Sequence, residues 1–118
     1  MNLLNQVLVI TFFLFTNCST EEQEYSCFKG ENRKVVGTFN NVDGLVLAPS
    51  INNCQTIYTL TGGPDLPERN LRLLAPCNLP TEYKQDSLKI IYSGYLFETF
   101  ENEDLCAQSF EITEIKKK

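Results

Sequence analysis

The stretch Ser87-Leu-Lys-Ile-Ile-Tyr-Ser-Gly-Tyr-Leu-Phe-Glu-Thr-Phe100 carries the clearest β-strand signal in this chain of 118 residues. A two-residue period places Leu88, Ile90 and Tyr92 on one face of an extended strand. Gly94 interrupts this period and predicts a bend or a bulge, after which the strand continues. The stretch therefore predicts a chain built around strands with one buried face.

Shorter strand-like runs lie on both sides of this stretch, separated by turn residues. Asp43-Gly44 predicts a tight turn, and a helix of one or two turns is expected over residues 78–86, capped by Asn78. Six short strands, with the helical turn between the fourth and the fifth, predict an all-β, OB-like barrel. The expected strands are residues 34–39, 45–48, 55–60, 71–74, 87–100 and 109–115.

Residues 1–17 have the pattern of a lipoprotein-type signal peptide. The apolar run Val7–Thr16 is too short to cross a bilayer of roughly 30 Å as a helix, but it has the length of a secretory h-region. Cys18 follows it and is expected to be lipid-modified and to begin the mature chain. The acidic residues 18–26 are expected to form a flexible tether, and residues 27–118 a single barrel domain.

The remaining cysteines are spread evenly along the chain, which predicts two disulfides behind an export signal. Four cysteines allow three pairings, and spacing alone leaves all three open. The fifth, Cys18, is the odd one, which agrees with lipid modification. Because Asn17 stands where a small residue usually precedes a lipidated cysteine, plain secretion is the alternative. The four expected disulfide cysteines are Cys27, Cys54, Cys77 and Cys106.

Composition excludes several classes of function. The net charge of −5 disfavours nucleic acid and anionic lipid headgroups, which need clustered Lys and Arg. The absence of histidine removes Ser-His and Cys-His catalysis and the common catalytic zinc sites. The acidic run Glu98–Asp104 lacks the spacing of a calcium loop and is interpreted as a solvated hairpin tip. We therefore expect a protein that is not an enzyme and that holds no cofactor or metal.

The segment Gly62-Gly-Pro-Asp-Leu-Pro-Glu-Arg-Asn70 is the candidate binding loop. A long loop stiffened by proline on a disulfide-braced barrel favours protein binding, because preorganisation lowers the entropic cost of association. Leu66, Pro67, Glu68 and Arg69 are expected near its tip, where Leu66 or Arg69 could enter a peptidase pocket. An ordinary barrel connection is the alternative interpretation.

Aromatic residues also suggest a second kind of binding surface. They resemble the aromatic faces with which OB barrels stack bases or sugars, although most of these rings are more simply explained as core. One or two exposed rings would suit a glycan. The residues are Tyr58, Tyr92, Tyr95, Phe97 and Phe100.

The segment Leu74-Ala-Pro-Cys-Asn-Leu-Pro-Thr-Glu-Tyr-Lys-Gln-Asp-Ser-Leu-Lys-Ile-Ile-Tyr-Ser-Gly94 resembles a recurring segment of small surface lipoproteins of the Bacteroidota type. The final run Ser109-Phe-Glu-Ile-Thr-Glu-Ile115 resembles their last strand. Ser87 stands where these proteins usually have glycine. The potempins, surface lipoproteins that inhibit secreted peptidases, are similar in size, anchoring and barrel.

The resemblance implies a disulfide pairing and a function. It pairs Cys54 with Cys106 and Cys27 with Cys77. It implies a non-enzymatic lipoprotein of the outer membrane, exposed at the cell surface, that inhibits a secreted peptidase. Ligand or glycan capture beside an outer-membrane uptake system is the alternative, as is immunity to a delivered toxin, and a secreted or periplasmic location is the alternative to surface anchoring.

Overall fold

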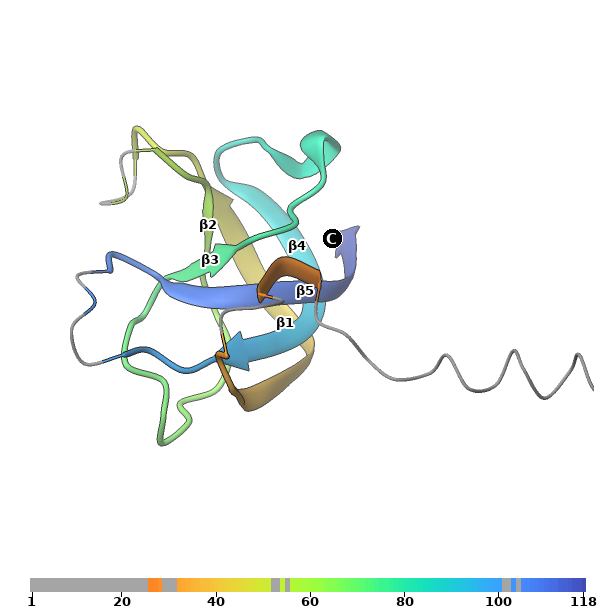
Figure 1. The fold of residues 1–118 in the computed structure, drawn as a ribbon. Coiled ribbons are helices and arrows are strands. Elements are labelled where there is room, and N and C mark those ends of the chain that lie inside the picture. Colours follow the sequence, from red (N-terminus) through yellow and green to blue (C-terminus); the bar gives the residue numbers. More distant parts are fainter. Residues whose placement is uncertain (1–25, 29–31, 52–53, 55, 101–102, 104) are drawn as a thin grey trace, which may run out of the picture.

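The computed structural model describes residues 26–28, 32–51, 54, 56–100, 103 and 105–118. Its strands close into a barrel in the order β1-β2-β3-β5-β4 (Figure 1). β3 and β5 run parallel, and the other neighbouring strands run antiparallel. The OB-like, all-β fold is confirmed, with five described strands instead of six. The elements are η1 (Ser26–Phe28), β1 (Val35–Leu47), β2 (Thr59–Leu60), β3 (Leu74–Pro76), η2 (Thr81–Tyr83), β4 (Leu88–Phe97) and β5 (Gln108–Lys117).

β1 is one long strand where the sequence predicted two strands and a tight turn. Asn41 adopts a φ of 49°, and the register against β4 shifts between Phe39 and Val42, which marks a bulge. A bulge bends a strand, and a small barrel needs such a bend in order to close. Asp43-Gly44 therefore stays within the strand, where the missing side chain of Gly44 admits the backbone carbonyl of Thr61.

Boundaries of other elements also differ from the prediction, and β4 ends at Phe97 instead of continuing to residue 100. β2 contains only the last two residues of the expected strand 55–60, because a hydrogen bond from the Ile57 N–H to the Cys54 carbonyl turns the chain first. β3 begins at Leu74, the last residue of the expected strand 71–74, and ends at proline. The expected helix is reduced to the single 3-10 turn η2. Gly94 does lie at a register shift of β4 against β5, as predicted.

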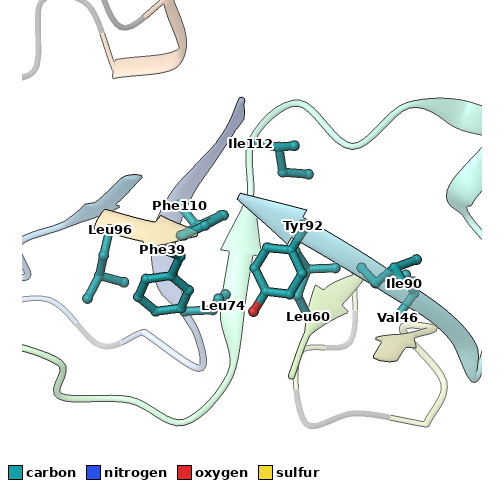
Figure 2. Packing of buried hydrophobic residues seen from close by; sticks show 9 residues of the cluster. All are labelled: Phe39, Val46, Leu60, Leu74, Ile90, Tyr92, Leu96, Phe110 and Ile112. Carbon is teal, nitrogen blue, oxygen red and sulfur yellow. The ribbon is translucent and has the colours of Figure 1, made fainter. Parts of the chain in front are cut away.

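An apolar cluster fills the barrel (Figure 2). The rings of Phe39, Tyr92 and Phe110 form its centre, with ring centroids 5.1 to 6.3 Å apart. The buried Tyr92 hydroxyl donates a hydrogen bond of 2.9 Å to the Thr61 carbonyl, so the polar end of this core residue is satisfied. The other members of the cluster are Val46, Leu60, Leu74, Ile90, Leu96 and Ile112.

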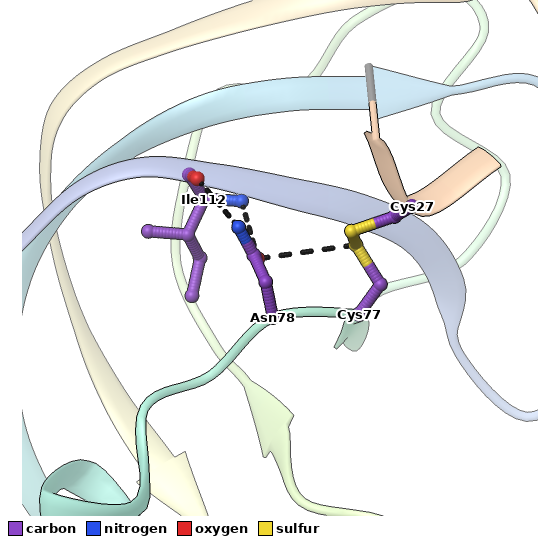
Figure 3. Close-up of a disulfide and its surroundings, with 4 residues drawn as sticks. All are labelled: Cys27, Cys77, Asn78 and Ile112. Atoms are coloured by element: carbon purple, nitrogen blue, oxygen red, sulfur yellow. Dashed lines mark hydrogen bonds between the residues drawn. A yellow bond between two sulfur atoms is a disulfide. The ribbon is translucent and has the colours of Figure 1, made fainter. Parts of the chain in front are cut away.

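Two disulfides brace the barrel. Cys27 pairs with Cys77, which ties η1 to the end of β3, and Cys54 pairs with Cys106, which ties the β1–β2 connection to the β4–β5 connection. This is the pairing that the resemblance implied. Beside the first disulfide, Asn78 bonds both backbone groups of Ile112, at 2.8 and 2.9 Å, instead of capping a helix (Figure 3).

The expected signal peptide 1–17 and the lipidation site Cys18 lie outside the described residues, as does all but the last residue of the expected tether 18–26. In the part of the chain that the structure describes, no helix is long and apolar enough to span a membrane.

Candidate functional site

The candidate site is the connection between β2 and β3, residues 61–73, called the β2–β3 loop below. It is the green segment that hangs below the barrel in the view of Figure 1. Gly62 and Gly63 open the loop with φ values of 96° and 99°, a conformation that side chains strongly disfavour. A Cβ atom on Gly63 would also collide with the ring of Phe39. The chain therefore passes close over the Phe39 ring where the loop begins.

A buried amide from β5 holds the second half of the loop. The Gln108 side chain is fully buried. Its Oε1 accepts hydrogen bonds from the N–H groups of Asn70 and Leu71, at 2.8 and 3.2 Å. Its Nε2 donates to the carbonyls of Glu68 and Phe97, at 3.1 and 2.9 Å. One side chain thus satisfies three backbone groups of the loop and joins them to the end of β4.

Arg69 holds the loop from within. Its guanidinium donates hydrogen bonds to the carbonyls of Pro64, Leu71 and Arg72, at 2.9, 3.2 and 2.6 Å. It also lies over the Phe39 ring, with Cζ 5.5 Å from the ring centroid. These bonds connect both halves of the loop to each other and to the core.

The four residues expected near the loop tip divide into two pairs. The Leu66 side chain packs against the core beside Gly37, and Arg69 is directed into the loop as described above. Pro67 and Glu68 are exposed. The two side chains that sequence reasoning offered to a peptidase pocket therefore support the loop, and its outer edge is formed by others. The exposed residues of this edge are Gly63, Pro64, Asp65, Pro67 and Glu68.

Sequence reasoning missed Gln108. Its position in the final strand gave a weak signal, because a glutamine at the start of a strand is ordinarily assigned to the surface. Its role follows only from the register that sets Gln108 of β5 against Leu74 of β3, next to the end of the loop.

A second set of contacts joins Arg33 to described residues of the β4–β5 connection. Arg33 forms a two-point ion pair with Glu103, including a hydrogen bond of 2.8 Å from Nη1 to Oε1, and lies over the ring of Phe100. The hydrogen bonds from Arg33 and from the Phe100 backbone lower the pKa of Glu103 from 4.5 to about 2. Within the expected acidic hairpin tip, Glu103 is therefore a structural anion, while Glu98 accepts a hydrogen bond from the Lys34 backbone N–H.

Large apolar side chains are exposed on the two connections that the Cys54–Cys106 disulfide joins. Ile51 and Ile57 lie in the β1–β2 connection and Phe100 in the β4–β5 connection, with exposed fractions of 62%, 38% and 41%. These two connections flank the surface with which OB barrels commonly bind their ligands.

One group of possible metal ligands occurs in the described part of the chain. A carboxylate oxygen of Glu111 and the sulfur atoms of Cys27 and Cys77 lie within 4.8 Å of one another. Because the two sulfur atoms are joined in a disulfide, they offer no thiolate, which is the form that binds a metal.

The sequence matches no protein-family model, and no curated protein matches it.

Proposed function

We propose that this protein is a non-enzymatic, surface-anchored lipoprotein that binds another protein through the β2–β3 loop, and that its partner is a secreted peptidase that it inhibits. The observation that carries the proposal is the fixed backbone of this loop. Gln108 and Arg69 hold it through six hydrogen bonds to its backbone groups, and a seventh joins Gln108 to β4. The edge around Pro64 and Glu68 stays exposed.

A fixed loop suits inhibition for a thermodynamic reason. Ordering one flexible side chain on binding costs roughly 0.5–1.5 kcal/mol, and ordering a flexible backbone adds to this cost. In the β2–β3 loop the backbone is ordered before binding, and Pro64 and Pro67 restrict it further. The loop can therefore enter a groove at little entropic cost and return unchanged.

Anchoring through Cys18 is part of the proposal. The two disulfides use Cys27, Cys54, Cys77 and Cys106, so Cys18 is the remaining cysteine of the five. Intact mass measured after membrane extraction should exceed the polypeptide mass by that of acyl chains. A mass without them would remove the anchored form of the proposal and leave a secreted protein.

The experiment is a titration of co-secreted metallo- and serine peptidases with the purified protein. We expect the activity of one of them to fall linearly to near zero at about one equivalent of a tight inhibitor. A variant in which Pro64, Asp65, Pro67 and Glu68 are replaced by Gly and Ser should inhibit at least about tenfold more weakly, because central contact residues contribute about 2 kcal/mol or more.

The matched control replaces Thr81, Glu82, Lys84 and Gln85 around η2 in the same way. These residues are equally exposed and lie outside the loop. The control should inhibit like the original protein. Equal loss in both variants, or no loss in the loop variant, would contradict binding through the β2–β3 loop.

One observation favours glycan capture as a second candidate. Phe100 exposes its ring in the β4–β5 connection, where Arg33 covers one face of it. An exposed aromatic ring is a common platform for sugars. Retention on polysaccharide columns that is lost in Phe100→Ala, together with indifference to peptidases, would favour this candidate over inhibition.

A further inference from the structure

Residues of the β2–β3 loop line an open hollow of about 370 Å³. Thr61, Gly62 and Gly63 line it from the first half of the loop, and Arg69 and Arg72 from the second, with Asp65 at its edge. The hollow thus belongs to the same fixed loop, and it shares Gly63 and Asp65 with the exposed edge described above.

Hydrogen-bond donors without acceptors gather here. Within the described part of the chain, the backbone N–H groups of Gly62 and Gly63 donate no hydrogen bond. The Arg69 guanidinium has five N–H donors, of which three bond to carbonyls. The residues that line the hollow therefore carry donors that the described residues do not satisfy.

The positive charge of the hollow is also unpaired. Carbonyl groups are the acceptors for Arg69, and they do not neutralise its charge. Among the described residues, no carboxylate lies within ion-pair distance of Arg69 or Arg72, whereas Arg33 pairs with Glu103. Two arginines without ion pairs are unexpected on a protein whose net charge is −5.

We propose that this hollow binds a carboxylate that the partner presents, an inference that rests on the proposed function of the loop. Guanidinium groups and backbone N–H groups together recognise carboxylates through paired, charge-assisted hydrogen bonds. Two guanidinium charges against the one of Asp65 leave a single positive charge. This charge matches a singly charged carboxylate better than a doubly charged phosphate or sulfate. The carboxylate belongs to an acidic side chain or to a C-terminus.

The test is an NMR titration of the ¹⁵N-labelled protein with small carboxylates. Acetyl-glutamate methylamide represents an acidic side chain, acetyl-glycyl-glycine represents a C-terminus, and acetyl-glutamine methylamide is the uncharged control. We expect saturable shifts of the Gly62 and Gly63 amides with one of the carboxylates and none with the control. The probe that binds more tightly identifies the source of the carboxylate.

Variants at Arg72 distinguish specific binding of the carboxylate in the hollow from non-specific electrostatic attraction to the protein surface. Arg72 is exposed and no side-chain partner of it is described, so Arg72→Gln should fold normally. It should bind the carboxylate about tenfold more weakly, whereas Arg72→Lys, which keeps the charge, should lose less. Lys84→Gln removes the same charge from the surface near η2 and should bind like the original protein.

Three results would overturn the proposal. These are the absence of saturable shifts, equal weakening in Arg72→Gln and Lys84→Gln, and tighter binding of sulfate than of either carboxylate. Because the titration involves no peptidase, its outcome is independent of the inhibition assay. Binding of a carboxylate without inhibition would refute only the proposed function. Inhibition without carboxylate binding would refute only the proposal that the hollow binds a carboxylate.

Discussion

Replacing Gln108 with leucine removes the hydrogen-bonding amide while keeping a side chain of similar volume at a fully buried position. The change removes the hydrogen bonds that the Gln108 side chain makes to two N–H groups and two carbonyls. A buried polar group that loses its partner costs about 1–3 kcal/mol. Water can reach Glu68 and Asn70, which are exposed, whereas the carbonyl of the buried Phe97 stays dry. We therefore expect a loss of about 2–4 kcal/mol of unfolding free energy out of the roughly 5–15 kcal/mol typical of a domain.

Urea unfolding followed by far-UV circular dichroism measures this loss, and the sequence holds no tryptophan for a fluorescence alternative. Amide exchange adds a local measurement, because Asn70 and Leu71 should exchange much faster in Gln108→Leu. The matched control is Gln85→Leu, which changes an exposed glutamine and should cost less than about 0.5 kcal/mol. The reasoning is refuted if Gln108→Leu unfolds like this control, or if the two amides keep their protection.

The variant Gln108→Glu tests the same contacts through the pH dependence of its stability. A carboxylate at this position still accepts from Asn70 and Leu71, but it faces the carbonyls of Glu68 and Phe97, to which it cannot donate. Burial and these carbonyls raise its folded-state pKa above the unfolded value. The stability of this variant should therefore be greatest below the unfolded pKa and fall as pH rises through the folded pKa. Stability that is unchanged between acidic and neutral pH would contradict the contacts described.

Three further outcomes are expected. Ser87→Gly should raise the unfolding free energy by about 0.4–1 kcal/mol, because Ser87 has a φ of 64° that glycine adopts without strain. Glu103→Gln should flatten the acid unfolding curve, since a folded pKa of about 2 against 4.5 means that the stabilisation by Arg33 is lost as pH falls through this window. Replacing Cys54 and Cys106 with alanine should cost about 4 kcal/mol in urea unfolding, because a loop of 52 residues is no longer closed in the unfolded chain.

The strands in the second half of the chain were predictable, because the two-residue period is undisturbed there. The strands expected over residues 87–100 and 109–115 are present as 88–97 and 108–117. Ser87 occupies a left-handed backbone position at the place where the resemblance has glycine. The long β1 was not predictable from Asp43-Gly44. An Asp-Gly pair occurs both in hairpin turns and in strands that another backbone approaches closely. Barrel closure decides between the two, and closure is a property of the whole chain.

The candidate site was predictable as a loop but not in its details. Its length, prolines and glycines identify residues 62–70 as an unusual connection. Which side chains point outward depends on contacts distant in sequence, such as Leu66 against Gly37 and Arg69 against Phe39. A short-range pattern contains no information on these contacts, so it does not distinguish inward side chains from tip residues.

The buried glutamine also bears on why the loop has this shape. Among the described buried residues, Gln108 is the one that carries an amide side chain, beside the smaller Thr59 and Ser93. An aliphatic side chain would make a simpler barrel core, but it would leave the loop backbone unpaired. Gln108 therefore contributes less to the barrel itself than to one conformation of residues 68–71. Because it bonds only to backbone groups of these residues, the exposed side chain of Glu68 is free to vary without disturbing these bonds. The residues that hold the loop backbone thus differ from those that would contact a partner. A loop of this kind can present different side chains to a protein partner while keeping its backbone conformation.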